Sequence, residues 1–164
     1  MAGPLDTTFI QLINQHLNIA HKVARIYFLD ADEQQDVKQE MMYQLWRSYA
    51  SFDGRSKFST WMYRVCLNTA LTFWKKNKKE KKERLAPGHQ QIPDVVSTDQ
   101  DETIALLQEA ITNLSSVNKA IVLLYLEDMS YDEIASVTGL SRSNVSVRLV
   151  RIRKELEIQL RSKL

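Results

Sequence analysis

The chain has 164 residues, of which 44% are hydrophobic and 26% charged, and its formal net charge is +2 at pH 7. This composition excludes a disordered or fibrous chain, and the length allows one ordinary domain or two small ones. The single cysteine, Cys66, excludes an internal disulfide, and no Cys/His spacing typical of zinc sites occurs, so we expect no metal and no cofactor.

Helical periodicity dominates the sequence, and no convincing alternating strand pattern appears. In the first half it predicts helices over about residues 6–28, 32–49 and 58–84, with a turn-rich loop at 51–56. The face of the first helix that we expect to be buried carries Phe9, Ile13, Leu17, Ala20 and Ala24.

The helix predicted over residues 32–49 has two contrasting sides. Its apolar side is expected to pack in the core and consists of Val37, Met41, Met42, Leu45 and Trp46. The opposite side is a polar strip of Asp36, Glu40, Tyr43, Gln44 and Arg47. Periodicity alone leaves two interpretations open, a docking surface for a partner or a solvated face.

The helix predicted over residues 58–84 also has two lines of side chains. The inward face is predicted to contain Phe58, Met62, Val65, Cys66, Thr69 and Phe73. The second line combines an aromatic ring with cationic and amide groups, a mixture suited to unpaired bases, and consists of Trp61, Arg64, Asn68, Leu71 and Lys75. Taken singly, Trp61 and Trp74 favour packing. The basic cluster at residues 75–84 is either a phosphate contact or a solvated helix end.

Residues 86–100 contain two of the three prolines and no apolar period, which predicts a linker. Helices are predicted after it over about residues 101–113, 116–127, 131–138 and 142–163. The expected fold class is therefore all-α, with two small helical domains, residues 1–85 and 101–164, joined by a flexible linker.

The second domain ends in the outline of a helix-turn-helix. Ser130 and Glu133 have the spacing of a capping box, Gly139 stands where a left-handed residue would end the short helix, and Ser141 offers a second N-cap. The long helix that follows has an apolar stripe of Val145, Leu149, Ile152, Leu156 and Leu160. Its other side suits a DNA major groove and carries Arg142, Ser143, Asn144, Val147, Arg148, Arg151 and Lys154. The alternative, an ordinary exposed face of a bundle, does not explain the two caps and the glycine turn.

Charge is strongly segmented along the chain. Residues 1–53 carry a net charge of −3, residues 54–84 carry +8, residues 85–133 carry −8 and residues 134–164 carry +5. Two separated basic segments favour two contacts with a polyanion over a uniformly basic surface.

Three stretches resemble a known family, in its order and at its spacing. Residues 36–47 (DVKQEMMYQLWR) resemble a D-[LV]-x-Q-E-x-x-x-x-[LV]-W segment, and residues 58–65 (FSTWMYRV) an F-x-T-W-[LM]-x-R-[IV] segment. Residues 130–156 are similar to a helix-turn-helix module. Together they resemble the extracytoplasmic-function (ECF) class of sigma-70-like factors of bacterial RNA polymerase, across nearly the whole chain.

The resemblance implies roles for these segments. The helix with the polar strip, to which it adds Gln39, would bind the clamp coiled coil of core RNA polymerase, with the flap as a second contact. The line from Trp61 to Lys75, with Lys76, would melt and read the −10 element of promoter DNA. The loop, with Phe52, Asp53, Gly54 and Arg55, would capture a flipped base. The helix-turn-helix would read the −35 element, although residues 142–144 (RSN) depart from the Gly-Thr pair of many members and leave its sequence open. An anti-sigma factor is a further candidate partner.

Two other classes of protein compete with a sigma factor. An autonomous helix-turn-helix regulator would bind palindromic DNA as a dimer through the second domain alone. An enzyme is disfavoured because no nucleophile–base pair, carboxylate pair or phosphate loop is visible, so no catalytic residue is assigned. The first residues lack the pattern of a signal peptide, and the longest apolar run, residues 120–126, is far shorter than the roughly 20 residues of a membrane span. We therefore expect a cytoplasmic protein without membrane insertion.

Overall fold

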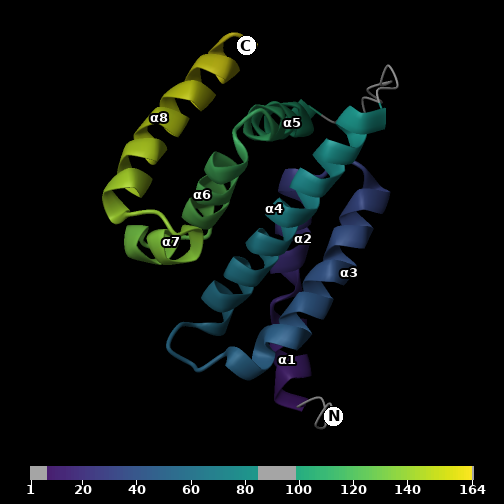
Figure 1. The fold of residues 1–164 in the computed structure, drawn as a ribbon. Coiled ribbons are helices and arrows are strands. Elements are labelled where there is room, and N and C mark those ends of the chain that lie inside the picture. The colour runs from purple at the N-terminus through teal and green to yellow at the C-terminus, as the bar shows by residue number, and fades with distance from the viewer. Residues whose placement is uncertain (1–6, 85–98, 164) are drawn as a thin grey trace. The chain divides into compact units, whose positions relative to one another are not determined.

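The computed structural model describes residues 7–84 and 99–163, and within these residues every regular element is a helix (Figure 1). The chain divides into two compact units, residues 1–74 and 75–164. The prediction of an all-α protein with two helical domains is confirmed. The predicted linker lies outside the described residues, except for residues 99 and 100, which begin a helix.

The first unit contains α1 (Thr7–Gln15), α2 (Leu17–Tyr27), α3 (Ala31–Ser48), the short 3-10 helix η1 (Tyr49–Ser51) and the first part of α4 (Phe58–Arg84). In Figure 1, α2, α3 and α4 run alongside one another. The rings of Phe28 and Phe73 meet edge-on, 5.7 Å apart between centroids, and join the end of α2 to α4.

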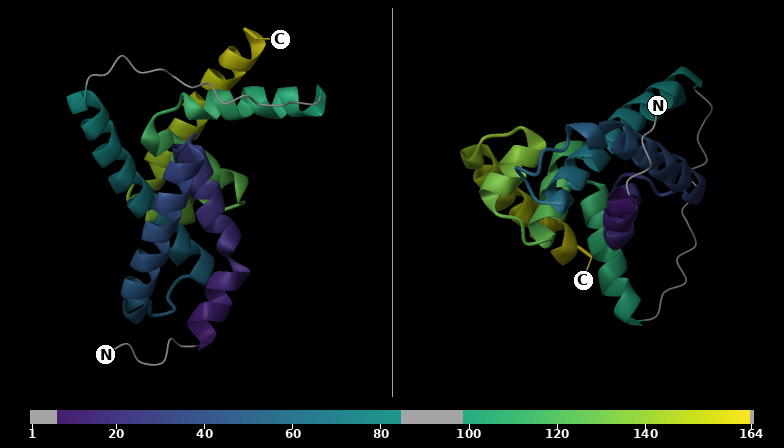
Figure 2. Two further views of the ribbon diagram at one scale, coloured as in Figure 1. Left: turned by 90° about the vertical axis from the view of Figure 1, so that its right-hand side faces the viewer. Right: turned by 90° about the horizontal axis from the view of Figure 1, so that it is seen from below.

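The single helix predicted over residues 6–28 is wrong, because a break at His16 divides it into α1 and α2 (Figure 2). His16 has φ −122° and ψ 18°, and its ring Nδ1 donates a hydrogen bond to the Leu12 carbonyl, 2.8 Å away. The ring also packs on Phe58, with 5.3 Å between centroids. The break changes the phase of the buried face, so Leu17 is 39% exposed.

Most of the predicted core of the first unit is confirmed. On α3, Val37, Met41 and Leu45 are fully buried at a spacing of four residues, which places one face of the helix against α2. Asp30 caps this helix by accepting a hydrogen bond from the Asp32 backbone N–H. The prediction for Trp46 is wrong, because its side chain is 45% exposed. Helix α4 is buried over a wider arc than one stripe, and its fully buried residues include Met62 and Cys66.

The second unit contains the last part of α4 together with α5 (Asp99–Thr112), α6 (Ser116–Leu126), α7 (Tyr131–Thr138) and α8 (Arg142–Arg161). The four predicted helices are therefore present, with ends within a few residues of those expected. Their core is a compact set of aliphatic side chains, all at most 6% exposed, that includes Ile121, Leu124, Ile134, Val137, Val145, Leu149 and Ile152.

Helix α6 ends in a Schellman motif that uses an aspartate in place of the usual glycine. Asp128 has φ +59°, its N–H donates to the Tyr125 carbonyl at 3.0 Å, and the Met129 N–H donates to the Leu124 carbonyl at 3.2 Å. A left-handed conformation costs a side-chain-bearing residue about 1 kcal/mol relative to glycine. The motif therefore stores a small strain that substitution can relieve.

Replacing Asp128 with glycine is expected to raise the stability of the second unit by up to about 1 kcal/mol. Gly139, which ends α7 at φ +77° with no atom within 4 Å of an added Cβ, gives the opposite control: Gly139→Ala should cost about the same amount. Thermal unfolding followed by circular dichroism would measure both. A lower melting temperature for Asp128→Gly would show that the aspartate side chain contributes more than its backbone strain costs.

Candidate nucleic-acid interface

The helix-turn-helix predicted from the sequence is formed by α7 and α8. Two serine N-caps and one left-handed glycine determine where these helices begin and end. The Ser130 hydroxyl caps α7 by accepting a hydrogen bond from the Glu133 N–H at 3.1 Å, and it donates to the Glu133 carboxylate at 3.3 Å. Gly139 ends α7 in the left-handed conformation, and Ser141 caps α8 by accepting from the Asn144 N–H at 3.1 Å. These devices set the direction in which α8 leaves the turn.

The face of α8 opposite its buried stripe is open to solvent. Among the predicted DNA-binding residues, those with exposed side chains are Arg142, Ser143, Asn144, Val147, Arg151 and Lys154. Arg142 forms an exposed ion pair with Asp132 of α7, 3.6 Å apart, which solvent screens and DNA phosphate can replace. From Arg142 to Lys154 the helix carries five basic side chains and no acidic one, so this face attracts a polyanion.

Arg148 differs from the other predicted contacts because its guanidinium is hydrogen-bonded to two side chains of the same unit. Its Nε donates to the Asn144 side-chain oxygen at 3.0 Å, and one Nη donates to the Asn118 side-chain oxygen of α6 at 3.1 Å. The side chain is half-buried. Arg148 therefore ties α8 to α6 and fixes Asn144 at the start of α8. Nearby, the Arg153 guanidinium donates to the Tyr125 hydroxyl and stands 5.1 Å from the centre of that ring.

The predicted line along α4 divides into buried and exposed members. Trp61 is only 8% exposed and packs on Tyr49, Phe52 and Phe58, with ring centroids 5.2–6.3 Å apart. The packing interpretation is therefore the correct one for this ring, which is not open to a stacked base in this structure. Arg64 and Leu71 are half-buried, while the exposed members are Asn68, Lys75 and Lys76.

The predicted loop is anchored at its first residue and open at its tip. Phe52 packs edge-on against Phe58 at 5.8 Å and against Trp61, so it belongs to the aromatic cluster. Gly54 has φ +76°, a conformation that glycine adopts without strain. Asp53 accepts a hydrogen bond from the Arg55 N–H and pairs with the Arg55 guanidinium at 3.1 Å, both side chains being largely exposed. The tip thus presents one anionic and one cationic group to solvent.

The polar strip of α3 lies on the surface of the first unit. Its members, from here on the α3 strip, are Asp36, Gln39, Glu40, Tyr43, Gln44 and Arg47, and each is exposed or half-exposed. Gln44 donates to the Glu40 carboxylate at 3.0 Å, and the exposed ring of Trp46 lies 6.4 Å from that of Tyr43. Sequence reasoning assigned Trp46 to the core, whereas the structure adds its ring to the surface beside the strip.

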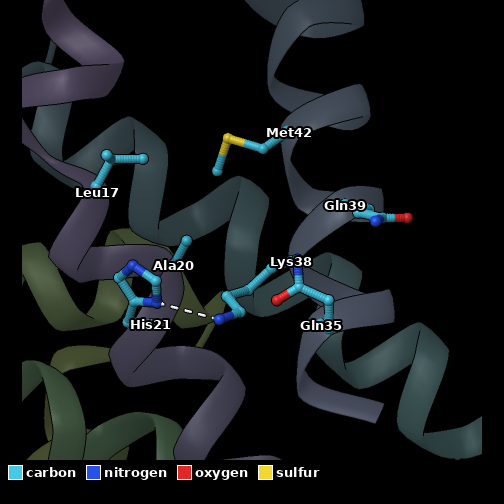
Figure 3. A pocket seen from close by; sticks show the side chains of 7 residues that line it. All are labelled: Leu17, Ala20, His21, Gln35, Lys38, Gln39 and Met42. Atoms are coloured by element: carbon cyan, nitrogen blue, oxygen red, sulfur yellow. Dashed lines mark hydrogen bonds between the residues drawn. The ribbon is translucent and has the colours of Figure 1, made fainter. Parts of the chain in front are cut away.

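A groove between α2 and α3 adjoins the α3 strip (Figure 3). Leu17, Ala20 and Met42 supply its apolar part, and Gln39 belongs both to the groove and to the strip. The Lys38 ammonium donates to Nδ1 of His21 at 3.2 Å and so links the two helices. Helical periodicity does not predict this groove, because the groove depends on how α2 packs against α3.

Two ionisable side chains with shifted pKa values, Cys66 and Lys119, are buried in the described residues. Burial raises the pKa of the Cys66 thiol to about 12, so the nucleophilic thiolate is suppressed. Burial also lowers the pKa of Lys119, on α6. Across residues 7–84 and 99–163, no cluster of three His, Cys, Asp or Glu side chains is placed to hold a metal ion, and no helix is long and apolar enough to cross a bilayer.

Two family models match the chain, sigma-70 region 2 over residues 12–80 and sigma-70 region 4 over residues 104–156. The RNA polymerase sigma-H factor of Pseudomonas aeruginosa is 29% identical over 162 residues, which cover 86% of this chain and 81% of the relative. The sigma factor SigV of Bacillus subtilis is 28% identical, over 92% of this chain and 90% of the relative. The ECF sigma-E factor of Haemophilus influenzae is 29% identical, over 91% and 85%.

Solved structures share the fold. The sigma factor RpoE of Bartonella quintana, in complex with the anti-sigma factor NepR, matches with a TM-score of 0.75 and 19% identity over 94% of this chain and 97% of its own. CnrH, in complex with the cytosolic domain of CnrY, matches with a TM-score of 0.69 and 22% identity over 95% and 89%. An autonomous regulator that acts through the second domain alone is not favoured, because residues 12–80 match sigma-70 region 2. With regions 2 and 4 in order and relatives that match along most of its length, the chain belongs to the ECF class of the sigma-70 family and is an RNA polymerase sigma factor.

Proposed function

We propose that the chain divides the work of a sigma factor between residues 1–85, which bind polymerase and open the −10 element, and residues 101–164, which read the −35 element. Residues 86–100 connect the two. The observation that carries this proposal is that α4 and α8 each bury one side in a core and carry basic, solvent-exposed side chains elsewhere. Two basic helices fit two separate segments of one DNA polyanion.

At the −10 element, the proposed contacts come from α4 and the loop before it. Asn68, Lys75 and Lys76 are exposed and offer amide and ammonium groups to an opened strand, with Arg64 and Leu71 at the edge of this surface. The loop tip, Asp53, Gly54 and Arg55, would take the flipped base. Trp61 and Phe52 are assigned a positioning role, because their rings pack against each other at the start of the loop.

At the −35 element, α8 would enter the major groove with its N-terminal turns. Arg151 and Lys154 are exposed and free to bind a base edge or a phosphate, while Ser143 and Asn144 stand at the helix start. Arg142 would exchange its ion pair with Asp132 for a phosphate. Arg148 would act chiefly by holding Asn144 in place.

Polymerase binding is assigned to the α3 strip, which would contact the clamp coiled coil, with the flap as a second contact of the chain. An anti-sigma partner is proposed because two proteins of the same fold are seen with NepR and with the cytosolic domain of CnrY. We place the protein in the cytoplasm, where polymerase works. The chain itself performs no catalytic step, since nucleotide addition belongs to the core enzyme.

Reconstitution with core RNA polymerase tests the proposal. The purified chain should co-elute with core enzyme, and the holoenzyme should start transcripts at a defined set of promoters, which start-site mapping would reveal. Absence of both co-elution and promoter-dependent transcripts would overturn it.

The lysines that follow Trp74 on α4 provide a separate prediction. Lys75, Lys76, Lys78 and Lys79 are exposed, and each phosphate contact contributes roughly 0.7–0.9 to the slope of log affinity against log salt. Replacing all four with glutamine should flatten that slope by up to about 3 for holoenzyme binding to promoter DNA. Lys163→Gln, two residues beyond the end of α8, is the control and should leave the slope unchanged. An unaltered slope in the fourfold variant would make the cluster a solvated helix end.

A further inference from the structure

Two neighbouring valines interrupt the polar face of α8. Val147 and Val150 stand three residues apart on the helix and are 48% and 53% exposed. Single exposed apolar residues are common, but valine is a poorer helix former than alanine and gains little from packing at such exposure. The pair therefore lowers the stability of the isolated domain slightly. A contact with a ligand would explain why valine stands at both positions.

The position of the pair along α8 limits what it can touch. Val150 is nine residues from the Ser141 cap, about 13 Å along the axis at 1.5 Å per residue. The major groove is about 12 Å wide, and a recognition helix contacts bases through its N-terminal turns. Val147, about 9 Å from the cap, lies within this width and Val150 lies at its far edge, whereas Ile158, the next exposed apolar residue on the helix, lies about 12 Å beyond Val150.

The charges around the pair favour DNA as the ligand. Arg151 follows Val150 directly, Lys154 lies one turn beyond, and both are exposed. The acidic residues of α8 begin only at Glu155. The exposed valine methyl groups thus lie beside cations that can bind phosphate. In the major groove, the apolar group that a base pair exposes is the 5-methyl group of thymine.

We propose that Val147 and Val150 read thymine 5-methyl groups, so that the −35 element of this sigma factor contains thymine at the positions facing them. The inference rests on the proposed role of α8 at the −35 element and makes that role specific. Arg148 does not compete for these positions, because Asn118 and Asn144 hold its guanidinium at the side of the helix. Sequence reasoning named Val147 and missed Val150, whose exposure becomes visible only in the packed unit.

Replacing thymine by deoxyuridine removes the methyl group and leaves the base-pairing edge unchanged, so it isolates the proposed contact. The probe is a promoter duplex obtained by start-site mapping, made with thymine or with deoxyuridine in its −35 element. Holoenzyme binding would be measured by fluorescence anisotropy for the wild-type chain and for Val147→Ala and Val150→Ala. Both substitutions replace an exposed valine with a better helix former, so folding is preserved. Ile158→Ala is the matched control chain, and deoxyuridine in the spacer is the matched control DNA.

Wild-type holoenzyme should bind the deoxyuridine duplex about three- to fivefold more weakly for each methyl group that is contacted. Each valine variant should lose a similar factor on thymine DNA and lose its sensitivity to deoxyuridine at one position, while Ile158→Ala keeps full sensitivity. Equal binding of both duplexes by the wild type, or a −35 element without thymine, overturns the inference. So does a loss of polymerase affinity in the valine variants with unchanged deoxyuridine sensitivity, which would assign the pair to a protein contact. Failure of the proposed function looks different, since no promoter duplex would then be bound specifically.

Discussion

Reversing the charge of Asp36 or Glu40 to arginine should weaken binding of the chain to core RNA polymerase by thirtyfold or more. Both carboxylates belong to the α3 strip, outside the core formed by Val37, Met41 and Leu45. A like charge placed in a complementary interface costs about 2–4 kcal/mol, and it acts without unfolding the helix that carries it. Competition with a labelled sigma factor for core enzyme would measure the affinity.

Neutral variants separate the charge effect from a change of shape. Asp36→Asn and Glu40→Gln keep the size of each side chain, and Glu40→Gln retains an oxygen that can accept from Gln44. They should weaken binding less than the arginine variants. Unchanged polymerase affinity in both arginine variants would remove the strip from the interface and leave it as a solvated face.

Replacing Arg151 with alanine is expected to reduce transcription from promoters that depend on the −35 element by roughly tenfold to a hundredfold. An arginine that forks onto a guanine contributes about 1–3 kcal/mol of discrimination, and Arg151 is exposed on the face of α8 opposite Leu149. Affinity for core polymerase should stay the same, so the effect appears only in run-off transcription and promoter binding.

A second arginine on the same helix supplies the matched control. Arg161 pairs with Glu157 at 2.6 Å in the last turn of α8 and lies about 15 Å beyond Arg151, so Arg161→Ala should leave transcription unchanged. Arg148→Ala should also lower −35-dependent transcription, but with a loss of thermal stability, because it leaves Asn118 and Asn144 without their donor. Equal losses of polymerase binding and promoter binding in Arg151→Ala would contradict the assigned role.

The features predicted correctly from the sequence are those encoded within a few residues. The caps at Ser130 and Ser141 and the left-handed Gly139 follow from side chains and backbone freedom within one turn, so the helix-turn-helix was predicted nearly to its ends. The buried stripe of α8 is equally local, because a helix that packs on one side repeats its apolar residues every three or four positions.

What the sequence did not predict depends on contacts between distant residues. The break at His16 involves the ring of Phe58, forty-two positions away, and the placement of Arg148 depends on Asn118 of another helix. Trp46 and Trp61 are the same residue type, each on an amphipathic helix. Trp46 is nevertheless exposed beside Tyr43, whereas Trp61 is buried among three aromatic rings. Hydrophobicity alone cannot distinguish them, because burial is decided by which neighbours the fold supplies.

The aromatic cluster beneath the loop has a consequence for how this protein can change over evolution. Phe52 and Phe58 hold both ends of the segment, so the residues between them form a short span whose anchors do not depend on its own composition. Closing so short a span costs little entropy, and at its tip Asp53 pairs with Arg55, two residues away. Residues 53–57 can therefore be substituted together while the hydrophobic core stays the same. On the role proposed for this loop, such substitutions would change the promoter preference of the sigma factor without first costing it its fold.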